Sequence, residues 1–301
     1  MVAIFTRLMK LNIYLPIICL LFFCSKFVSA QTDSTETDIS SKKTPYFKAS
    51  LNFLTNNVYQ GRTDSVKVPY LTASFAYYLK NGLNINVSES FQTNTSKFDN
   101  FAVDLGYDHD LSDEWALTVD LNKSFYNKNS TSIRSAVLAD LDAEIIYDPG
   151  FLTFNLSAGL AFASKTDYTT ALSVSHWFAL DKAEHLSIVP QFMVNAGTQN
   201  FYTDYRKKTG KRKLIAITNY TVANNTGFAI LDYEIDAPIT WANKSWSFFL
   251  DPVFAIPVHP ITTTTTSTVS YLDKTKNTTK TNTENLKGVF YASVGIDFKF
   301  K

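Results

Sequence analysis

The stretch "SVGIDFKFK" (Ser293–Lys301) closes the chain, and its pattern decides how the rest is interpreted. Alternate residues are apolar, and the residues between them are small or charged. The apolar set is Val294, Ile296, Phe298 and Phe300, and the other set is Gly295, Asp297 and Lys299. Because successive side chains of a strand point to opposite faces, the pattern predicts a strand with one apolar and one polar face. It does not say whether the apolar face meets a protein core or lipid.

The first thirty residues predict a secretory signal peptide. Arg7 and Lys10 form a basic start, residues 11–23 form an apolar run, and Val28-Ser29-Ala30 gives a small-residue cleavage site. Residues 31–45 are polar and lack periodicity, as expected for a flexible periplasmic segment. We therefore expect export by a Sec-type route and a mature chain that begins at Gln31.

The composition excludes several classes of protein. The chain of 301 residues is 45% hydrophobic and has a formal charge of +1, which argues against disorder and against a nucleic-acid partner. Both cysteines, Cys19 and Cys24, lie in the signal peptide. The exported protein is therefore expected to have neither a disulfide nor a thiol ligand for a metal.

From Tyr46 onward the chain breaks into alternating segments, usually of nine or more residues. Ordinary strands average about five or six residues, whereas a strand that crosses a bilayer at a tilt needs about nine to eleven. No apolar run of about 18 residues follows the signal peptide, so no transmembrane helix is expected. About twelve crossings are predicted, at 47–53, 71–79, 83–87, 101–107, 115–125, 137–147, 152–162, 172–180, 188–196, 228–241 (with a phase slip near Ile230), 246–258 and 290–300.

The connections between these segments alternate in length. Every second one is a short turn: Asn81-Gly82, "LSDE" (111–114), "DPG" (148–150), "DKAEH" (181–185) and "ANKS" (242–245). The others are interpreted as longer and polar, the two longest being 198–226 and 259–285. Short turns on one side and long loops on the other are typical of a bacterial outer-membrane barrel with both termini in the periplasm.

A secreted β-sandwich or lipocalin-like barrel has strands that alternate in the same way. Three features favour the membrane barrel instead. First, the polar face of residues 153–163 carries small uncharged side chains. Second, three tryptophans flank short turns on the apolar face: Trp115, Trp241 and Trp246. Third, strands in hydrocarbon need a closed sheet, because every backbone donor and acceptor must have a partner there. The sequence therefore predicts an all-β fold, a closed up-and-down antiparallel transmembrane β-barrel of about twelve strands over residues 46–301.

The C-terminal strand resembles the signal that outer-membrane barrels present to the barrel-assembly machinery. That signal has a polar residue, a small residue and aromatic residues at alternate positions near the terminus, and here Ser293, Gly295, Phe298 and Phe300 match it. Lys301 departs from the pattern, which usually ends on the aromatic residue. The resemblance implies that the assembly machinery is a partner during biogenesis.

The segment "NVYQGRTDSVKVPYLTASFAYYLKNGLNINVS" (57–88) resembles the opening of the uncharacterised Gcw_chp family of outer-membrane proteins. The family places an aromatic residue before a glycine, then Ser or Thr, then Pro. These positions are Tyr59, Gly61, Thr63 and Pro69 here. The long basic and Thr-rich loops depart from that family. The resemblance implies a barrel and no reaction.

The four histidines do not suggest catalysis. His109 and His185 fall near short turns, His176 is on the apolar face, and His259 follows the penultimate strand. None shares a face with a serine as barrel hydrolases require, and no pair has metal-ligand spacing. We therefore expect no catalytic residue, no metal and no cofactor, which leaves an outer-membrane enzyme as the least favoured class.

Acidic residues dominate the predicted inner face. Ten of them share the parity of the polar face: Asp104, Asp120, Asp140, Asp142, Glu144, Asp232, Glu234, Asp236, Asp251 and Asp297. A ring of carboxylates raises the local concentration of cations, so one hypothesis is a narrow, porin-like passive channel that prefers cations. Two alternatives stay open. The charges could pair and close the lumen, or the barrel could be a structural or surface-binding protein that acts through its long loops.

A basic cluster lies in the longer of the predicted outer loops. It consists of Arg206, Lys207, Lys208, Lys211, Arg212 and Lys213. Such a run is either simply solvated or binds anionic groups, and in an outer loop the anion would be a lipopolysaccharide headgroup.

Overall fold

The structure is a computed structural model that describes residues 44–63, 67–130, 132–202, 217–224, 226–271 and 274–301. The predicted signal peptide and most of segment 31–45 lie outside these ranges. Twelve strands form a closed ring, and each pairs with the ring strands that precede and follow it in sequence. They are β1 (Tyr46–Leu54), β4 (Tyr70–Tyr78), β5 (Leu83–Gln92), β6 (Lys97–Asp110), β7 (Trp115–Tyr126), β8 (Ala139–Tyr147), β9 (Thr153–Phe162), β10 (Thr166–Ser175), β13 (Gln191–Gly197), β15 (Ala229–Asp236), β17 (Trp246–Pro257) and β20 (Val289–Phe300).

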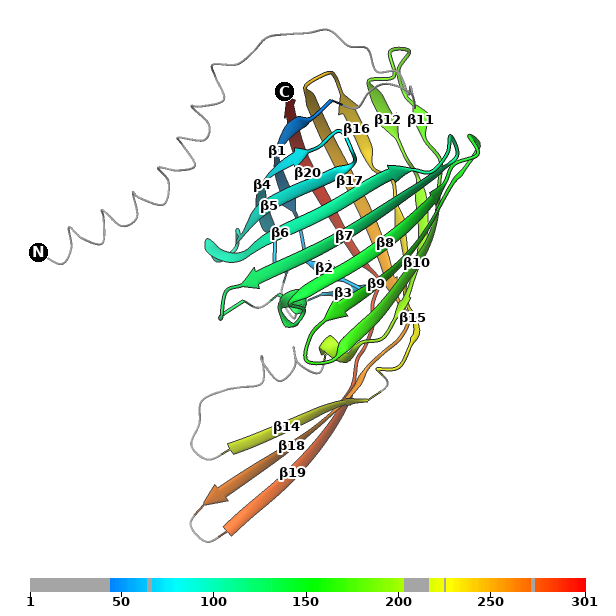
Figure 1. The fold of residues 1–301 in the computed structure, drawn as a ribbon. Helices are drawn as coiled ribbons and strands as arrows, with labels where there is room; N and C mark the ends of the chain where they lie inside the picture. Colours follow the sequence, from blue (N-terminus) through cyan, green and yellow to red (C-terminus); the bar gives the residue numbers. More distant parts are fainter. Residues whose placement is uncertain (1–43, 64–66, 131, 203–216, 225, 272–273) are drawn as a thin grey trace, which may run out of the picture. The chain divides into compact units, whose positions relative to one another are not determined.

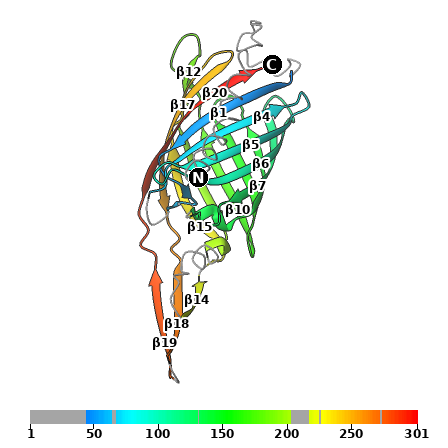
Figure 2. The same cartoon turned by 90° about the vertical axis from the view of Figure 1, so that its left-hand side faces the viewer.

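The ring closes where the last strand meets the first. β1 and β20 are antiparallel, with paired positions that run from Phe47 opposite Phe300 to Leu54 opposite Ser293. β20 also pairs with β17, so its two edges are both hydrogen-bonded. Figures 1 and 2 show the strands winding around the barrel, with the C-terminus at the end that carries the turn between β16 and β17. The predicted fold class and the strand number are confirmed.

The outer face of the barrel is apolar and exposed, as the alternation predicts. Leu105, Leu156 and Leu172 are each more than half exposed on this face. Aromatic residues gather beside the short turns, where Trp115 stacks on Tyr147 with ring centroids 4.5 Å apart. Within the described ranges, no helix is both long and apolar enough to cross a membrane.

Three strands are interrupted near one end of the barrel. The short strands β11 (Phe178–Ala179), β12 (Leu186–Ile188) and β16 (Ile239–Ala242) continue the line of β10, β13 and β15. Pro190 and Pro238 stand at two of these breaks, because proline has no N–H to donate to the ladder. The expected phase slip in β15 is also present. Asn195 pairs with Asp232 and Ala196 pairs with Ile230, so Leu231 is the extra residue of a bulge.

Two details of the sequence interpretation are wrong. The outer connections at 93–96 and 163–165 are as short as the opposite turns, because β5, β6, β9 and β10 extend farther than their apolar runs. The crossing predicted from Val137 begins at Ala139, since residues Ile133–Ala136 form a 3-10 turn. Val137 is 2% exposed and packs with Phe201 and Ile261, so its apolar character reflects a loop core and not lipid contact.

A hairpin that the strand pattern did not predict lies inside the barrel. It consists of β2 (Val58–Tyr59) and β3 (Arg62–Thr63), joined by Gln60 and Gly61. A Cβ added at Gly61 would lie 2.8 Å from Cβ of Asp232 and 2.9 Å from Cβ of Pro257, so the hairpin tip touches the barrel wall. Gly61 also has a φ of +69°, which a residue with a side chain rarely adopts. Figure 1 shows β2 and β3 within the ring of strands.

A second, separate sheet is built from two of the long loops. Its strands are β14 (Ile217–Asn224), β18 (Thr262–Tyr271) and β19 (Lys274–Thr283), with β18 in the centre. β18 and β19 form a hairpin between β17 and β20. The long outer connection 259–285 is therefore mostly strand.

Candidate functional site

The register of β5 to β9 brings several of the predicted acids together on one wall. Asp104 lies between Asn86 and Asn122 on the neighbouring strands. Asn86 donates to its carboxylate at 2.9 Å, and Asn122 donates to the other oxygen. Glu144 lies opposite Thr118 and Ser157, with no basic residue beside it in the ladder.

Two acids of this wall face each other directly. Asp120 on β7 pairs with Asp142 on β8, and both side chains are exposed although they stand on the inner face. Side chains at directly opposite positions are about 4.5–5.5 Å apart at Cβ, and like charges there are destabilising. Water or cations that screen the pair would relieve this repulsion, as would a proton on one of the two carboxyl groups.

Glycines make room for these carboxylates. A Cβ added at Gly159 would lie 2.0 Å from Oδ1 of Asp142 and 2.5 Å from Oγ1 of Thr169. A Cβ at Gly106 would lie 2.7 Å from Oδ1 of Asp120. The small residues of the inner face thus give space to acids and not to a packed core.

A second acidic wall lies on β15 and β17. Asp232, Glu234 and Asp236 share the inner face of β15, and the Tyr291 hydroxyl donates to Glu234 at 3.5 Å. Asp251 lies opposite Ser293 on β20, and Asp297 lies between Ser50 and Ser247. Of the ten predicted acids, Asp140 is the one that forms an ion pair with a described residue, Arg134.

Buried contacts hold the inward hairpin to the loops. The Arg62 side chain is 3% exposed, and its Nε lies 3.2 Å from Glu284 after β19. Glu284 also accepts the backbone N–H of Ile261 at 2.9 Å. The Asn57 side chain donates to Ser132 at 3.0 Å. One mouth of the barrel is therefore narrowed by a hairpin that several loops hold in place.

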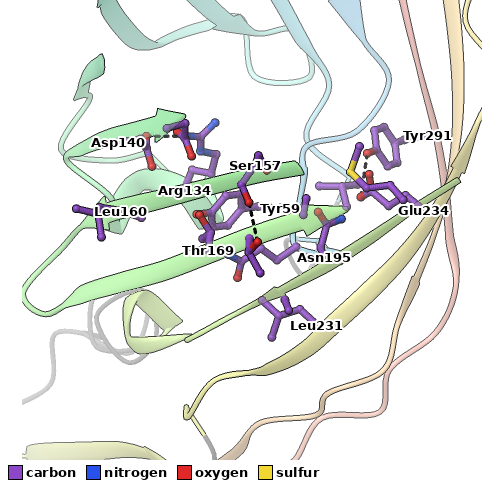
Figure 3. A pocket seen from close by; sticks show the side chains of 18 residues that line it. Tyr59, Arg134, Asp140, Ser157, Leu160, Thr169, Asn195, Leu231, Glu234 and Tyr291 are labelled. Carbon is purple, nitrogen blue, oxygen red and sulfur yellow. Dashed lines mark hydrogen bonds and ion pairs between the residues drawn. The ribbon is translucent and has the colours of Figure 1, made fainter. Parts of the chain in front are cut away.

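A cavity of about 340 Å³ lies between this hairpin and the barrel wall (Figure 3). Arg134 bridges the two sides. Its Nη2 lies 2.8 Å from Asp140, and its guanidinium lies over the Tyr59 ring, 5.0 Å from the centroid. Burial disfavours the charge of Arg134, but the neighbouring Asp140, Tyr126 and Tyr59 together outweigh this effect and the pKa is raised. Burial also raises the pKa of Tyr59, which keeps the phenol neutral.

Three further acids on the inner side were not among the predicted residues. Asp99 is 2% exposed and accepts from Tyr70 at 2.6 Å, while Asp167 is fully buried and accepts the N–H of Phe201 at 2.7 Å. Both fasten loops to the barrel. Asp108 accepts from Asn84 and Thr118 in the lumen. Asp108 shares the parity of Asp104, so the strand pattern could have predicted its inward position. Asp99 stands in a bulge, where the alternation of faces is broken.

The remaining predicted site residues fall in different places. The basic cluster 206–213 lies outside the described residues. The four residues of the expected assembly signal lie on β20, where Gly295 faces the lumen and Phe298 and Phe300 face outward. Among the described residues, no group of three or more His, Cys, Asp or Glu side chains is arranged to hold a metal ion.

The chain matches no family model and no curated protein, so the resemblance to the Gcw_chp family stays a prediction. Among solved structures it is similar to the KdgM porin, with 8% identity and a TM-score of 0.48 over 84% of this chain and 99% of that one. It is also similar to the NanC porin, with 9% identity and a TM-score of 0.46 over 84% of this chain and 100% of that one. A third similar structure is LpxR from Salmonella typhimurium, with 7% identity and a TM-score of 0.43 over 83% of this chain and 99% of that one. These likenesses concern the shape of the barrel alone.

Proposed function

We propose that the protein is a narrow passive channel of the bacterial outer membrane that prefers small cations. The observation that carries this proposal is the opposed, exposed pair of Asp120 and Asp142 on the inner face of a closed barrel. Such a pair lowers the free energy of unfolding unless water and cations screen it, so its presence favours a solvated lumen. A ring of carboxylates in that lumen concentrates cations and repels anions.

The outer face of the barrel supports a position in a membrane. A closed ring with a continuous exposed apolar belt, and with Trp115 and Tyr147 stacked beside a short turn, suits a bilayer and its headgroup level. We propose that the short turns and both termini lie in the periplasm, after Sec-type export. The hairpin and the long loops then face outward.

The inward hairpin gives the channel its constriction. Three of the four residues that resemble the Gcw_chp motif fall on this hairpin, with Tyr59 in β2, Gly61 at the tip and Thr63 in β3, whereas Pro69 directly precedes β4. We propose that this motif marks a hairpin that narrows the outer mouth. Its position between the acidic walls would make the pore selective by size as well as by charge.

The test is ion conduction through purified protein in planar lipid bilayers. With a KCl gradient, the wild-type protein should give small unit currents and a reversal potential of the sign expected for K⁺. Replacing Asp120→Asn together with Asp142→Asn should reduce the cation preference at similar unit conductance. Asp113→Asn, which removes one exposed charge from a short turn, is the matched control. Absence of currents, or preference for Cl⁻, would contradict the proposal.

One observation favours a second function, a surface-binding barrel. In the β18–β19 hairpin, Thr262, Thr264 and Thr266 pair with Thr283, Thr281 and Thr279 on one face, whereas Lys280 belongs to the other face. This ordered surface, together with the basic cluster 206–213, could contact lipopolysaccharide headgroups. A barrel without its β18–β19 hairpin that conducts normally but no longer binds lipopolysaccharide would support this role.

A further inference from the structure

The inward hairpin is held in the barrel by side chains and not by a sheet. β2 and β3 pair with each other and, among the strands that the structure describes, with no strand of the barrel. Each has two residues, and a two-stranded hairpin on its own is marginally stable at best. The position of the hairpin therefore depends on the side chains that bind it to its surroundings.

Arg62 connects this hairpin to both legs of the outer β18–β19 hairpin. Its Nε lies 3.2 Å from Glu284, which follows β19, and its Nη2 donates to the backbone oxygen of His259, which precedes β18. The two legs are joined to each other at the same place. The N–H of Ile261 donates to the Glu284 carboxylate at 2.9 Å, and the N–H of Glu284 donates to the backbone oxygen of Ile261 at 3.0 Å. We call these four residues the latch: Arg62, His259, Ile261 and Glu284.

The tip of the inward hairpin is held in an unfavourable state. Gln60 has a φ of +51° and Gly61 a φ of +69°, as a two-residue turn of this type requires at both positions. Glycine adopts this conformation readily, whereas a residue with a side chain does so at a cost. The side-chain oxygen Oε1 of Gln60 is also buried without a hydrogen-bond donor in the described part of the chain. A buried acceptor without a donor is destabilising, so the contacts of the latch must offset this cost.

The inward hairpin does not fill the space between itself and the barrel wall. Val58, Tyr59 and Gln60 line one side of the cavity of about 340 Å³, and residues of β9, β10 and β13 line the other side (Figure 3). Side chains that border a cavity lack packing partners on that side. A segment with such a face opens at a lower free energy than one that is packed all round.

We propose that the inward hairpin is a movable plug of the channel and that the latch couples it to the outer β18–β19 hairpin. In the closed state Arg62 is bonded to both legs of the outer hairpin, and the plug narrows the mouth. Separation of the two legs draws Glu284 away from Arg62, and the plug then leaves the wall at Asp232 and widens the pore. This inference rests on the proposed function, because it describes how that channel is regulated.

The first test measures the exposure of the plug without any current. Gln60→Cys introduces a single thiol into the mature chain, because both native cysteines lie in the predicted signal peptide. A water-soluble maleimide should label it slowly. Adding Glu284→Gln should raise the labelling rate roughly tenfold or more, since a charged hydrogen bond of the latch is lost. Glu114→Gln makes the same chemical change at an exposed short turn and should leave the rate unchanged. Different migration of unheated and boiled samples on an SDS gel shows that each variant is a folded barrel.

The second test acts on the outer hairpin alone. Thr262 and Thr283 lie directly opposite each other beside the latch, with their hydroxyl oxygens 2.9 Å apart. A disulfide in the variant Thr262→Cys/Thr283→Cys would hold the two legs together and keep Glu284 in place. Hydrogen exchange of residues 58–62 should then be slower in the oxidised protein than after addition of a reductant. Equal exchange in the oxidised and reduced proteins would overturn the coupling to the outer hairpin.

Unit conductance separates this inference from the proposed function. In planar bilayers Glu284→Gln should give a larger unit conductance than Glu114→Gln. Cation-selective currents with equal labelling and equal conductance in these two variants would overturn the plug and leave the channel intact. Faster labelling in the Glu284→Gln background, in a protein that carries no current, would overturn the channel and support the movable hairpin. Faster labelling at equal conductance would show that the hairpin moves without closing the pore, which also overturns the plug.

Discussion

The glycine at position 295 has two possible explanations. Either a side chain would not fit there, or the barrel-assembly machinery recognises the glycine. A Cβ at this position would lie 2.3 Å from two ring atoms of Phe249 and 3.2 Å from the backbone oxygen of Leu51. Overpacking of this kind typically costs about 1–3 kcal/mol. Because the nearest atoms belong to one phenylalanine ring, a smaller side chain at Phe249 should relieve the clash.

We therefore expect Gly295→Ala to lower the free energy of unfolding of the purified barrel by about 1–3 kcal/mol, with Phe249→Leu in the same chain restoring most of the loss. Denaturant unfolding from lipid vesicles would measure both. If glycine acts through recognition by the assembly machinery, the result differs. Gly295→Ala would then leave purified stability unchanged and reduce the amount of folded barrel in cells.

Arg62 and Glu284 form the buried ion pair that holds the inward hairpin, with side chains 3% and 16% exposed. Arg62→Met leaves a buried carboxylate without its partner, which costs on the order of 3 kcal/mol or more. We expect the hairpin to loosen, with faster hydrogen exchange at Tyr59 and a larger unit conductance. The double variant Arg62→Met/Glu284→Met removes the stranded charge and should lose less stability than Arg62→Met. Equal exchange rates in wild type and Arg62→Met would contradict the role of this pair.

At the scale of single residues, parity in the strands is what carries the prediction of lumen acids. A period of two assigns every residue of a regular strand to one face. It could not identify Arg134, which stands in a 3-10 turn, or Asp167, whose partners Thr198 and Phe201 follow it by about thirty positions. Contacts between loops leave no periodic signal in the sequence.

At the scale of elements, the β18–β19 hairpin pairs with β14 and, among the strands that the structure describes, with no strand of the barrel. Replacing residues 264–281 with a short turn keeps the buried Thr263 and its hydrogen bond to the backbone oxygen of Asn282, and should therefore leave the barrel pairings intact. We expect unheated and boiled samples of the shortened protein to migrate differently on an SDS gel, as closed barrels do. Its free energy of unfolding should lie within about 0.5 kcal/mol of the wild-type value, as for changes remote from packed features. A loss of several kcal/mol would mean that this hairpin supports the barrel.

The twelve crossings were predictable and the inward hairpin was not, for a physical reason. Strands that cross a bilayer need about nine to eleven residues, so each one shows a long alternation of apolar and polar residues in the sequence. The strands β2 and β3 have two residues each, too few for any period to be visible. Gly61 matches a position of the family motif, but only the structure shows that a Cβ added there would lie 2.8 Å from Cβ of Asp232.

At the scale of the whole molecule, closure depends on the pairing of the first and last strands. The register sets Ser50 opposite Asp297 on the inner face and Ala49 opposite Phe298 on the outer face. Opposite positions alternate between wide and narrow pairs in an antiparallel ladder, and the narrow type suits a disulfide better. Because both native cysteines belong to the predicted signal peptide, cysteines introduced at these positions would be the ones available to pair.

We expect at least one of the pairs Ser50→Cys/Asp297→Cys and Ala49→Cys/Phe298→Cys to cross-link on mild oxidation. The disulfide would join the two ends of the barrel, so the boiled protein should migrate faster without reductant than with it. The mismatched pair Ser50→Cys/Phe298→Cys places its side chains on opposite faces and should not cross-link, because its Cβ atoms point apart. Cross-linking of the mismatched pair alone would show that the register at this seam is shifted by one residue, so that one of the two strands turns its inner face toward lipid, which contradicts the closure of the barrel through β1 and β20.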